Sequence, residues 1–267
     1  MDNLNNDNII HEIYDDIEII KFKKLMEFPE LIHCYTLRKH NCNLDITKPE
    51  NKENLKECYR KISKILKTNE KNIVQPYQTH TDYIEIVENT KTSYKEVDGL
   101  ITDKKDILFA TTSADCISLL FYDPNKKVIS NIHSGWRGTV KKIGKKAVKM
   151  MIDKYNSDPK DIICCICPSI RKCHFEVDSD VMEIFEKEFK YTGRIDEIIE
   201  KGNIIENKQK YYIDTVLINK IILEEIGIDK NNIIDSGICT VCNSDSFHSY
   251  RVDRNKSGRN AAFIGLI

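Results

Sequence analysis

Four short apolar runs crowd into the middle of the chain and constrain its fold more than any other feature. The runs YIEIV, ILFATT, ISLLFY and VISNIH are rich in β-branched and aromatic residues, and turn formers such as Asp123-Pro124-Asn125 separate them. Runs of this length and composition are typical of neighbouring strands. The sequence therefore predicts a sheet over residues 83–133.

Helical spacing appears on both sides of this predicted sheet. Apolar residues recur every three or four positions over residues 51–67, 139–155 and 181–189, and again from about Asp214 to Ile226, which predicts amphipathic helices. The runs IICCI (162–166) and NAAFIGLI predict further buried strands. Mixed strands beside several helices predict an α+β fold in which helices cover mixed sheets.

The size and charge of the chain narrow the class of protein. With 267 residues, we expect a single domain over residues 1–267. Charged residues make up 31% but nearly cancel to a net charge of -1, which argues against nucleic acid or an anionic membrane surface as partner and favours a small substrate. The start of the chain has no basic leader or long apolar stretch, so we expect a cytoplasmic protein with reduced cysteines. Nothing in the sequence sets the oligomeric state.

Two histidines and one cysteine stand out because each lies at the edge of a predicted strand. His80 lies in QTH, Cys116 in SADC and His133 in HSGWRGT. Taken alone, each could be an ordinary core residue; gathered in one cleft, they would form a three-ligand metal site. A zinc ion held by three protein ligands keeps its fourth position open for water, which distinguishes catalytic from structural zinc sites. We therefore expect an enzyme.

The turn after His133 is a candidate anion site. Gly135 and Gly138 permit a tight backbone, and the turn runs directly into a predicted helix. A helix start offers free amide hydrogens to an anion. Arg137 would add a forked cation beside the metal ligand.

The C-terminal region supplies further cations. Arg251, Arg254 and Arg259 fall in one loop that contains Gly258, and Arg38 follows the strand-like segment IHCYTL. Isolated surface arginines are usually only solvated, but several in one loop suit a phosphate or a carboxylate.

The remaining cysteines carry less signal. Cys239 and Cys242 form a CxxC pair, whereas Cys164 and Cys165 lie in a buried run. A structural zinc site usually needs a second closely spaced pair, and no other cysteines have that spacing. We therefore expect all four to pack as small apolar side chains.

Taken together, the motifs resemble a known family. The strings QTH, DGLIT, SADC, HSGWRGT, CPSI, FEV, CT and SYR-GR follow one another in this order between Arg38 and Arg259. They resemble the laccase-domain family named after YfiH, which includes FAMIN-like proteins and was formerly described as polyphenol oxidases. The resemblance implies one α+β domain with sheets sandwiched by helices. It also implies zinc, or alternatively copper, at His80, Cys116 and His133.

The resemblance also implies an activity, because members of this family are regarded as purine nucleoside phosphorylases and adenosine deaminases. The expected substrates are inorganic phosphate and adenosine, inosine or methylthioadenosine, with adenosine also deaminated to inosine. The expected catalytic residues are His80, Cys116 and His133, with Asp115 as the candidate for proton transfer. The expected phosphate-binding residues are Arg38, Arg137, Arg251 and Arg259.

Three alternatives stay open at this point. A metal-free cysteine hydrolase would use Cys116, activated by His133 or His80, on an amide, for instance in editing peptidoglycan precursors. A copper-bound polyphenol oxidase would suit one cysteine and two histidines, but a multicopper enzyme needs a histidine-rich trinuclear cluster and the chain has 7 histidines in all. A zinc-stabilised binding module is the non-enzymatic alternative.

Overall fold

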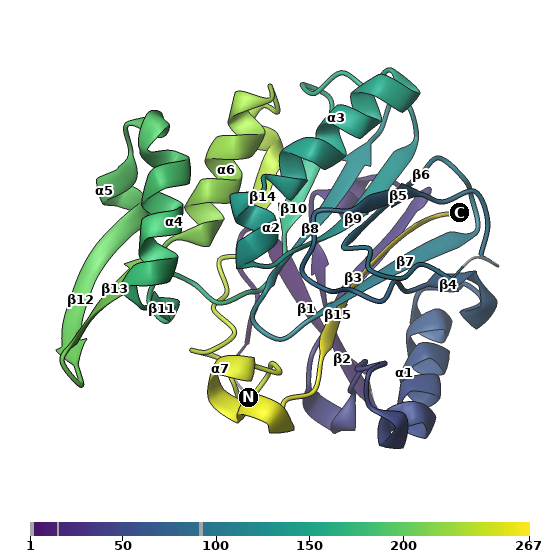
Figure 1. Ribbon diagram of the computed structural model, residues 1–267. Coiled ribbons are helices and arrows are strands. Elements are labelled where there is room, and N and C mark those ends of the chain that lie inside the picture. The colour runs from purple at the N-terminus through teal and green to yellow at the C-terminus, as the bar shows by residue number, and fades with distance from the viewer. Residues whose placement is uncertain (1–2, 15, 91–92) are drawn as a thin grey trace.

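Two mixed sheets of six strands each form the centre of the molecule (Figure 1). The computed structural model describes residues 3–14, 16–90 and 93–267. In the first sheet the order is β1 (Ile9–Tyr14), β2 (Ile17–Phe22), β3 (Leu31–Thr36), β15 (Asn260–Leu266), β7 (Ile107–Ser113) and β4 (Ile73–Val74). In the second it is β14 (Ile233–Asp235), β10 (Ile163–Ile166), β8 (Ile117–Asp123), β9 (Val128–Ser134), β6 (Gly99–Thr102) and β5 (Ile84–Ile86).

The main core lies between these two sheets. Leu120 and Tyr122 of β8 share a buried cluster with Phe109 of β7 and Ile264 of β15. Because successive side chains of a strand point to opposite faces, the alternate residue Phe121 belongs to a different cluster, on the outer face of the second sheet. β8, with the sequence ISLLFYD, is therefore a strand buried on both of its faces.

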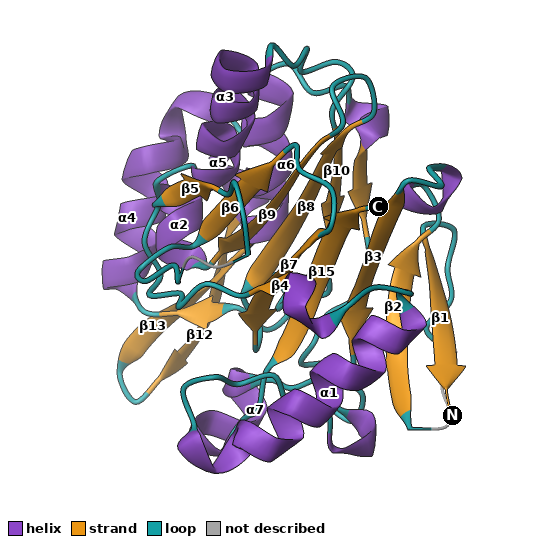
Figure 2. Ribbon diagram, turned by 90° about the vertical axis from the view of Figure 1, so that its right-hand side faces the viewer, coloured by secondary structure: helices purple, strands orange, loops and turns teal. Residues whose placement is uncertain are grey.

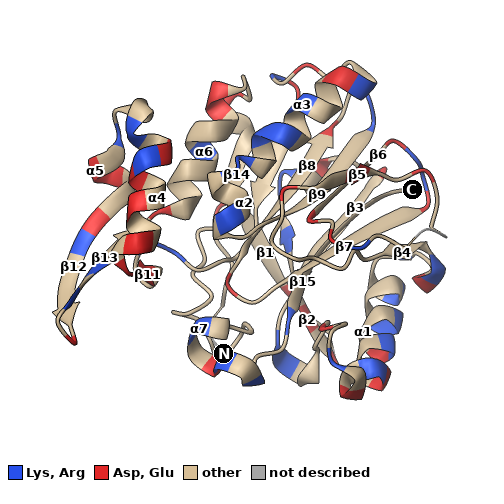
Figure 3. Cartoon of the chain, viewed as in Figure 1, with Lys and Arg blue, Asp and Glu red and all other residues tan. Residues whose placement is uncertain are grey.

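Helices cover both outer faces, which completes four layers (Figure 2). The outer face of the second sheet packs against α3 (Ile143–Tyr155) and α6 (Thr215–Glu225). The outer face of the first sheet packs against α1 (Lys52–Ile65). The predicted α+β architecture with helices on mixed sheets is thus confirmed. The helices carry charges of both signs on their exposed sides, as Figure 3 shows for α1 and α4 (Ser179–Phe189).

A smaller sheet extends beyond the main layers. Its order is β11 (Glu176–Val177), β13 (Lys208–Ile213) and β12 (Ile199–Ile205), next to α4 and α5 (Ile195–Ile198). The sequence patterns did not predict β12 and β13, because their side chains are mostly exposed or half-buried and lack a regular apolar face. The antiparallel strands β1 and β2 were also not predicted.

The single helix predicted over residues 139–155 is wrong. It is divided into α2 (Trp136–Val140) and α3, because Lys142 takes a left-handed backbone conformation with φ of 58°. Lys142 Nζ then lies 2.8 Å from Glu188 Oε1 and 4.7 Å from the centre of the Tyr191 ring. The helix after the HSGWRG turn has only five residues, so the strong positive end expected there for an anion is lost.

Two connections pass from the first sheet to the second and prepare the site. The chain crosses once between β4 and β5 and again between β7 and β8. The second crossing is short and contains Asp115, whose φ of 88° is unusual for a residue other than glycine. Along the part of the chain that the structure describes, no helix is long and apolar enough to cross a membrane.

Candidate metal centre and its cavity

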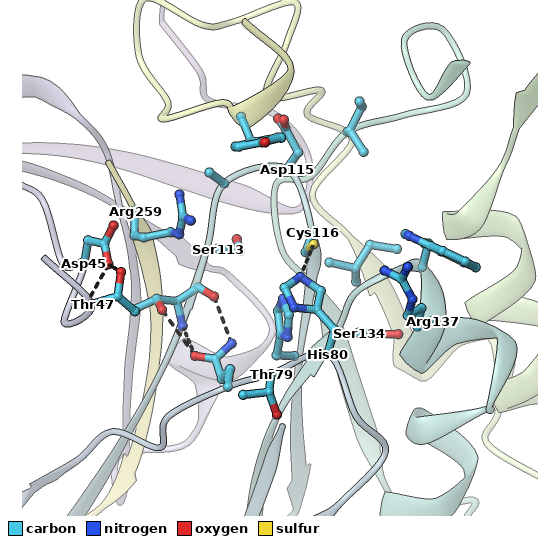
Figure 4. Close-up of a pocket in the computed structure, with 18 of the residues that line it drawn as sticks. Asp45, Thr47, Thr79, His80, Ser113, Asp115, Cys116, Ser134, Arg137 and Arg259 are labelled. Atoms are coloured by element: carbon cyan, nitrogen blue, oxygen red, sulfur yellow. Dashed lines mark hydrogen bonds between the residues drawn. The ribbon is translucent and has the colours of Figure 1, made fainter. Parts of the chain in front are cut away.

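His80, Cys116 and His133 come together where the two crossings meet the end of β9 (Figure 4). Their ligand atoms all lie within 4.8 Å of one another, and His80 Nε2 is 3.8 Å from Cys116 Sγ. A tetrahedral zinc ion separates its sulfur and nitrogen ligands by about 3.6 Å, given the usual bond lengths. One thiolate and two imidazoles therefore fit a metal ion that keeps one coordination position for another ligand.

Strand pairing accounts for the proximity of two of these ligands. Ser118 of β8 lies opposite His133 of β9, which places the turn before β8 next to the end of β9. His80 comes from the other crossing and has a left-handed backbone with φ of 62°. Its side chain is exposed, whereas His133 is buried. The cluster therefore has one side open to solvent.

Asp98 supports two of the three ligands with one buried carboxylate. Its Oδ1 lies 2.7 Å from His133 Nδ1 and accepts a hydrogen bond of 3.1 Å from the backbone N–H of His80. Its Oδ2 accepts from the backbone N–H and the hydroxyl of Thr81, each at 2.7 Å. Carboxylates behind a metal-binding histidine commonly fix the ring and its tautomer. Asp98 was missed as a functional residue, although the DGLIT motif contains it.

The ionisation of Asp98 agrees with this role. Burial alone would raise the pKa of its carboxyl group, but the hydrogen bonds and charge of His133 and the contacts with Thr81 lower that pKa to about 2. Asp98 is therefore a carboxylate at neutral pH, and it keeps the Nδ1 proton of His133 in place.

Cys116 and His133 perturb each other in the protein without metal. Burial opposes ionisation of the Cys116 thiol, but hydrogen bonding and charge from His133 and His80 lower its pKa to about 6. Burial likewise opposes the imidazolium form of His133, but Asp98 and Cys116 raise its pKa to about 9. A thiolate is thus available at neutral pH, either for a metal or as a nucleophile.

Gly135 is required for space at this site. A Cβ atom added there would lie 2.8 Å from His80 Cδ2 and 3.4 Å from Cys116 Sγ. The first contact is closer than side chains tolerate. A glycine directly after the end of β9 thus allows the His80 ring to approach the thiol.

A cavity of about 550 Å³ opens beside the three ligands. Three of the predicted anion-binding arginines line it: Arg137, Arg251 and Arg259. Figure 4 shows Arg137 and Arg259 on opposite sides of Cys116. Aromatic side chains complete the lining and offer apolar surface to a ring-shaped ligand: Tyr77, Trp136, Phe175 and Tyr250. This size is within the range of small-molecule sites.

The arginines differ in how they are held. Arg137 is exposed, with its guanidinium 4.3 Å from the centre of the Trp136 ring. Arg251 is half-buried and donates to the carbonyl oxygens of His174 and Glu176 at 2.8 and 3.1 Å. Burial lowers the pKa of Arg251, although Asp115 acts against this. An arginine keeps its charge even so, and Arg251 lines the cavity as a cation.

Arg38 lies outside this cavity. Its Nη1 is 3.0 Å from Asp253 Oδ2 and donates to the carbonyl oxygen of Ser244 at 2.8 Å. The structure therefore does not bring Arg38 together with the other three candidate arginines, and it is left out of the phosphate site proposed below.

Asp115 lines the cavity, but its carboxylate is already engaged. Oδ1 accepts from the Thr240 hydroxyl at 2.7 Å, while Oδ2 accepts from the Ser249 hydroxyl at 3.0 Å and from the Arg251 N–H at 2.7 Å. All three donors come from the C-terminal loop region, at Thr240, Ser249 and Arg251. The geometry suits a role in positioning the β7–β8 crossing against the C-terminal loop.

The fold and this centre place the chain in a known family. Residues 35–267 match the family described as multi-copper polyphenol oxidoreductase laccase, and the chain belongs to that family. It is 35% identical over 178 residues to the purine nucleoside phosphorylase YlmD of Bacillus subtilis, an alignment that covers 66% of this chain and 60% of that protein. It is 33% identical over 197 residues to a purine nucleoside phosphorylase of Clostridium acetobutylicum, covering 73% of this chain and 78% of that one.

A solved structure supports the same assignment. The crystal structure of the hypothetical protein YfiH of Bacillus licheniformis superposes with a TM-score of 0.84 at 28% identity, over 95% of this chain and 100% of that chain. The family resemblance expected from the sequence motifs is thereby confirmed.

Proposed function

We propose that the protein is a zinc-dependent purine nucleoside phosphorylase that also deaminates adenosine. The observation that carries this proposal is that a cluster able to hold a metal ion and three arginines line one cavity. The names of the two curated relatives support the phosphorylase part. The proposed substrates are inorganic phosphate with adenosine, inosine or methylthioadenosine.

In phosphorolysis, the residues of the cavity bind and orient both substrates. Arg251, with Arg137 or Arg259, holds phosphate so that one of its oxygens attacks the anomeric carbon of the sugar. A carbon–oxygen bond forms while the carbon–nitrogen bond breaks, and the departing purine keeps the electron pair and takes up the proton that the attacking phosphate loses. Orienting two reactants in this way is the largest contribution that such a site can make. The aromatic side chains provide the surface for the purine.

Around the metal, the chain supplies orientation and fixed charge. His80, Cys116 and His133 would hold zinc, which when bound supplies Lewis-acid chemistry and activates water for replacement of the adenine amino group. Asp98 keeps the proton on His133 Nδ1, so the other ring nitrogen remains a ligand. Deamination consumes one water and releases ammonia, and it does not need the arginines.

The direct test is incubation of purified zinc-loaded protein with adenosine, with and without phosphate, followed by chromatography of the products. We expect adenine and ribose 1-phosphate only when phosphate is present, and inosine in either case. Free purine that forms equally without phosphate would indicate a hydrolase. The absence of all these products would contradict the proposal.

A cysteine hydrolase is the second candidate, because the pKa of Cys116 is lowered to about 6 beside His133. Its test is the pH profile of iodoacetamide labelling in zinc-stripped protein. Labelling of Cys116 should rise through about pH 6, because the thiolate forms above its pKa. Burial and its cysteine neighbours raise the pKa of Cys173 to about 12, so this residue is the control. If zinc-free protein turns over an amide and loses this activity in step with labelling, the hydrolase is favoured.

Three of the five histidines outside the centre have unrelated partners, which favours zinc enzymology over multicopper oxidation. His11 lies 2.9 Å from Glu18, His33 accepts from the Phe22 N–H, and His248 bonds to the carbonyl oxygen of Cys42. These side chains have separate structural partners, whereas a trinuclear copper centre gathers its histidines. Copper in the His80–Cys116–His133 centre would be a substitute for zinc.

A further inference from the structure

A second group of soft ligands lies outside the proposed metal centre. Cys173, His174, Cys239 and Cys242 offer three sulfurs and one ring nitrogen, all within 4.8 Å of one another. The sequence predicted that Cys239 and Cys242 pack as apolar side chains, because no second pair had the usual spacing. The fold supplies the missing pair as two adjacent residues, Cys173 and His174. These four residues take no part in the reactions proposed for the cavity.

The distances within the group match those of a tetrahedral zinc site. Zinc–ligand bonds of ordinary length place two sulfurs about 3.8 Å apart and a sulfur and a nitrogen about 3.6 Å apart. Cys173 Sγ is 3.8 Å from Cys242 Sγ. His174 Nδ1 is 3.2, 3.7 and 3.5 Å from the sulfurs of Cys173, Cys239 and Cys242. The nitrogen thus lies close to all three sulfurs, as the ligands on one ion do.

Both loops that supply the ligands are tightly formed. The carbonyl oxygen of Arg171 accepts hydrogen bonds from the N–H groups of His174 and Phe175, which closes the turn at the first pair. The carbonyl oxygen of Cys239 accepts from the backbone N–H and the side-chain amide of Asn243, which closes the turn at the second pair. The ligands are therefore held by backbone turns in the protein itself.

Hydrogen bonds and an ion pair also join the two loops beside the cluster. Arg171 makes a paired contact with the carboxylate of Asp235, with 3.0 Å from Nη1 to Oδ2, and its Nε donates to the carbonyl oxygen of Ile238 at 3.3 Å. Ser169 and Cys239 form an isolated parallel bridge. Arg171 lies two residues before Cys173, and the bridge includes Cys239 itself, so these contacts fix the relative position of the two ligand pairs.

We propose that Cys173, His174, Cys239 and Cys242 bind a second zinc ion in a closed structural site. Four protein ligands complete a tetrahedron and leave no position for water, and a Cys₃His set is typical of structural zinc. The site therefore does not take part in catalysis.

A zinc ion there would support one wall of the substrate cavity. Thr240, between the two cysteines of the CxxC pair, donates to Asp115 Oδ1 at 2.7 Å. The carbonyl oxygen of His174 accepts from Arg251 Nη1 at 2.8 Å. The second site thus stands behind an arginine of the proposed phosphate site and behind the carboxylate next to Cys116.

The metal content of the wild type and four variants tests the proposal. Zinc-loaded wild type should carry two zinc ions per chain, Cys242→Ser one, His80→Ala/Cys116→Ser one, and the combination of the three substitutions none. Cys58→Ser on α1 is the cysteine control and should keep both ions. One zinc ion in the wild type together with none in His80→Ala/Cys116→Ser would overturn the second site.

A measurement that leaves the second site intact covers the case in which Cys242→Ser fails to fold. In cobalt-loaded His80→Ala/Cys116→Ser, a thiolate-to-cobalt charge-transfer band should appear at one cobalt per chain. In crystals of the zinc-loaded wild type, anomalous scattering at the zinc edge should give a peak between Cys173 and Cys242. Absence of the band, or of the peak at this position, would contradict the proposal even if the first centre is occupied and active.

Discussion

The two Cys/His groups of this molecule use similar atoms in different ways. The first group consists of three ligands from three separate segments and faces a cavity: His80, Cys116 and His133. Cys173, His174, Cys239 and Cys242 come from two short turns and provide four ligands. The number of ligands decides the chemistry, because a complete protein tetrahedron leaves no position for a reactant. The comparison teaches that the open group suits reaction and the closed group suits support.

The surroundings differ in the same sense. The open group is backed by the buried carboxylate of Asp98, which contacts both His133 and the His80 backbone. The closed group is backed by the Arg171–Asp235 ion pair, which joins chain segments, and Arg171 Nε also donates to the carbonyl oxygen of Ile238 next to Cys239. The first arrangement controls a ligand's proton, whereas the second controls only the position of loops.

The largest contrast should come from removing one sulfur from each group. Cys116→Ser should lower phosphorolysis and deamination by more than about 100-fold, since loss of a ligand exceeds the usual cost of losing a partner behind one. Cys242→Ser should reduce turnover by less than about tenfold, because its site only supports the cavity wall. Steady-state turnover of both purified variants measures this. Equal losses would remove the distinction between the groups.

Removal of the carboxylate behind the open group should have the next largest effect. Asp98→Asn should weaken zinc binding or turnover by about 10- to 100-fold, because the His133 proton and the His80 loop lose their shared acceptor. Chelator competition measures the zinc affinity of the first centre directly.

The matched control for Asp98 is Asp123→Asn. Asp123 is a buried carboxylate at the far end of β8, where it accepts from the N–H groups of Asn125 and Lys126. This variant should keep the zinc affinity of the wild type. If both variants lose zinc equally, general destabilisation and not the contact with His133 explains the loss.

Arg251 should affect phosphate specifically. Hydrogen bonds to charged groups contribute about 1.5–3 kcal/mol, so Arg251→Ala should raise the KM for phosphate by about tenfold or more. The rate of phosphate-independent adenosine deamination should change much less. Arg38→Ala is the control, because Arg38 pairs with Asp253 outside the cavity. An unchanged KM for phosphate in Arg251→Ala would exclude Arg251 from phosphate binding.

The last prediction concerns stability near the closed group, without an effect on the chemistry. Burial opposes ionisation of Asp235, but Arg171 and Lys220 lower its pKa to about 2. A carboxyl group with a lowered pKa stabilises the fold above its unfolded pKa of about 4, and this contribution is lost as the pH falls through about 2. Asp235→Asn should therefore cost about 2 kcal/mol at pH 7 and little at pH 2.

Urea unfolding at both pH values measures this difference. Glu57→Gln removes an exposed ion pair with Arg60 on α1 and serves as the control, with little change at either pH. A cost for Asp235→Asn that is the same at pH 7 and pH 2 would contradict the assignment to its ionised form.

Local patterns were sufficient for much of the fold. The helices over residues 52–65 and 215–225 and the strands β7 to β10 follow from apolar periodicity that a single segment carries in itself. The break at Lys142 was not predictable in this way, because apolar spacing continues across it; in the fold Lys142 contacts Glu188 and Tyr191, which lie far along the chain. The exposed strands β12 and β13 were not predicted because they have no regular apolar face.

The site was predictable where residue type alone narrows the chemistry. His80, Cys116 and His133 could be singled out because imidazole and thiolate are rare and reactive. Asp98 could not, since one of many carboxylates becomes important only through its contact with His133. The closed group was missed because its pairs, Cys173–His174 and Cys239–Cys242, are joined only by the folded chain.

The two crossings between the sheets have a consequence for how the protein acquires its activity. His80 and Cys116 each lie on a segment that leaves one sheet and enters the other, whereas His133 belongs to the second sheet alone. The three ligands therefore cannot come together before the two sheets have docked. Metal binding at this centre should therefore be a late step of folding, and a partly folded chain should have no activity.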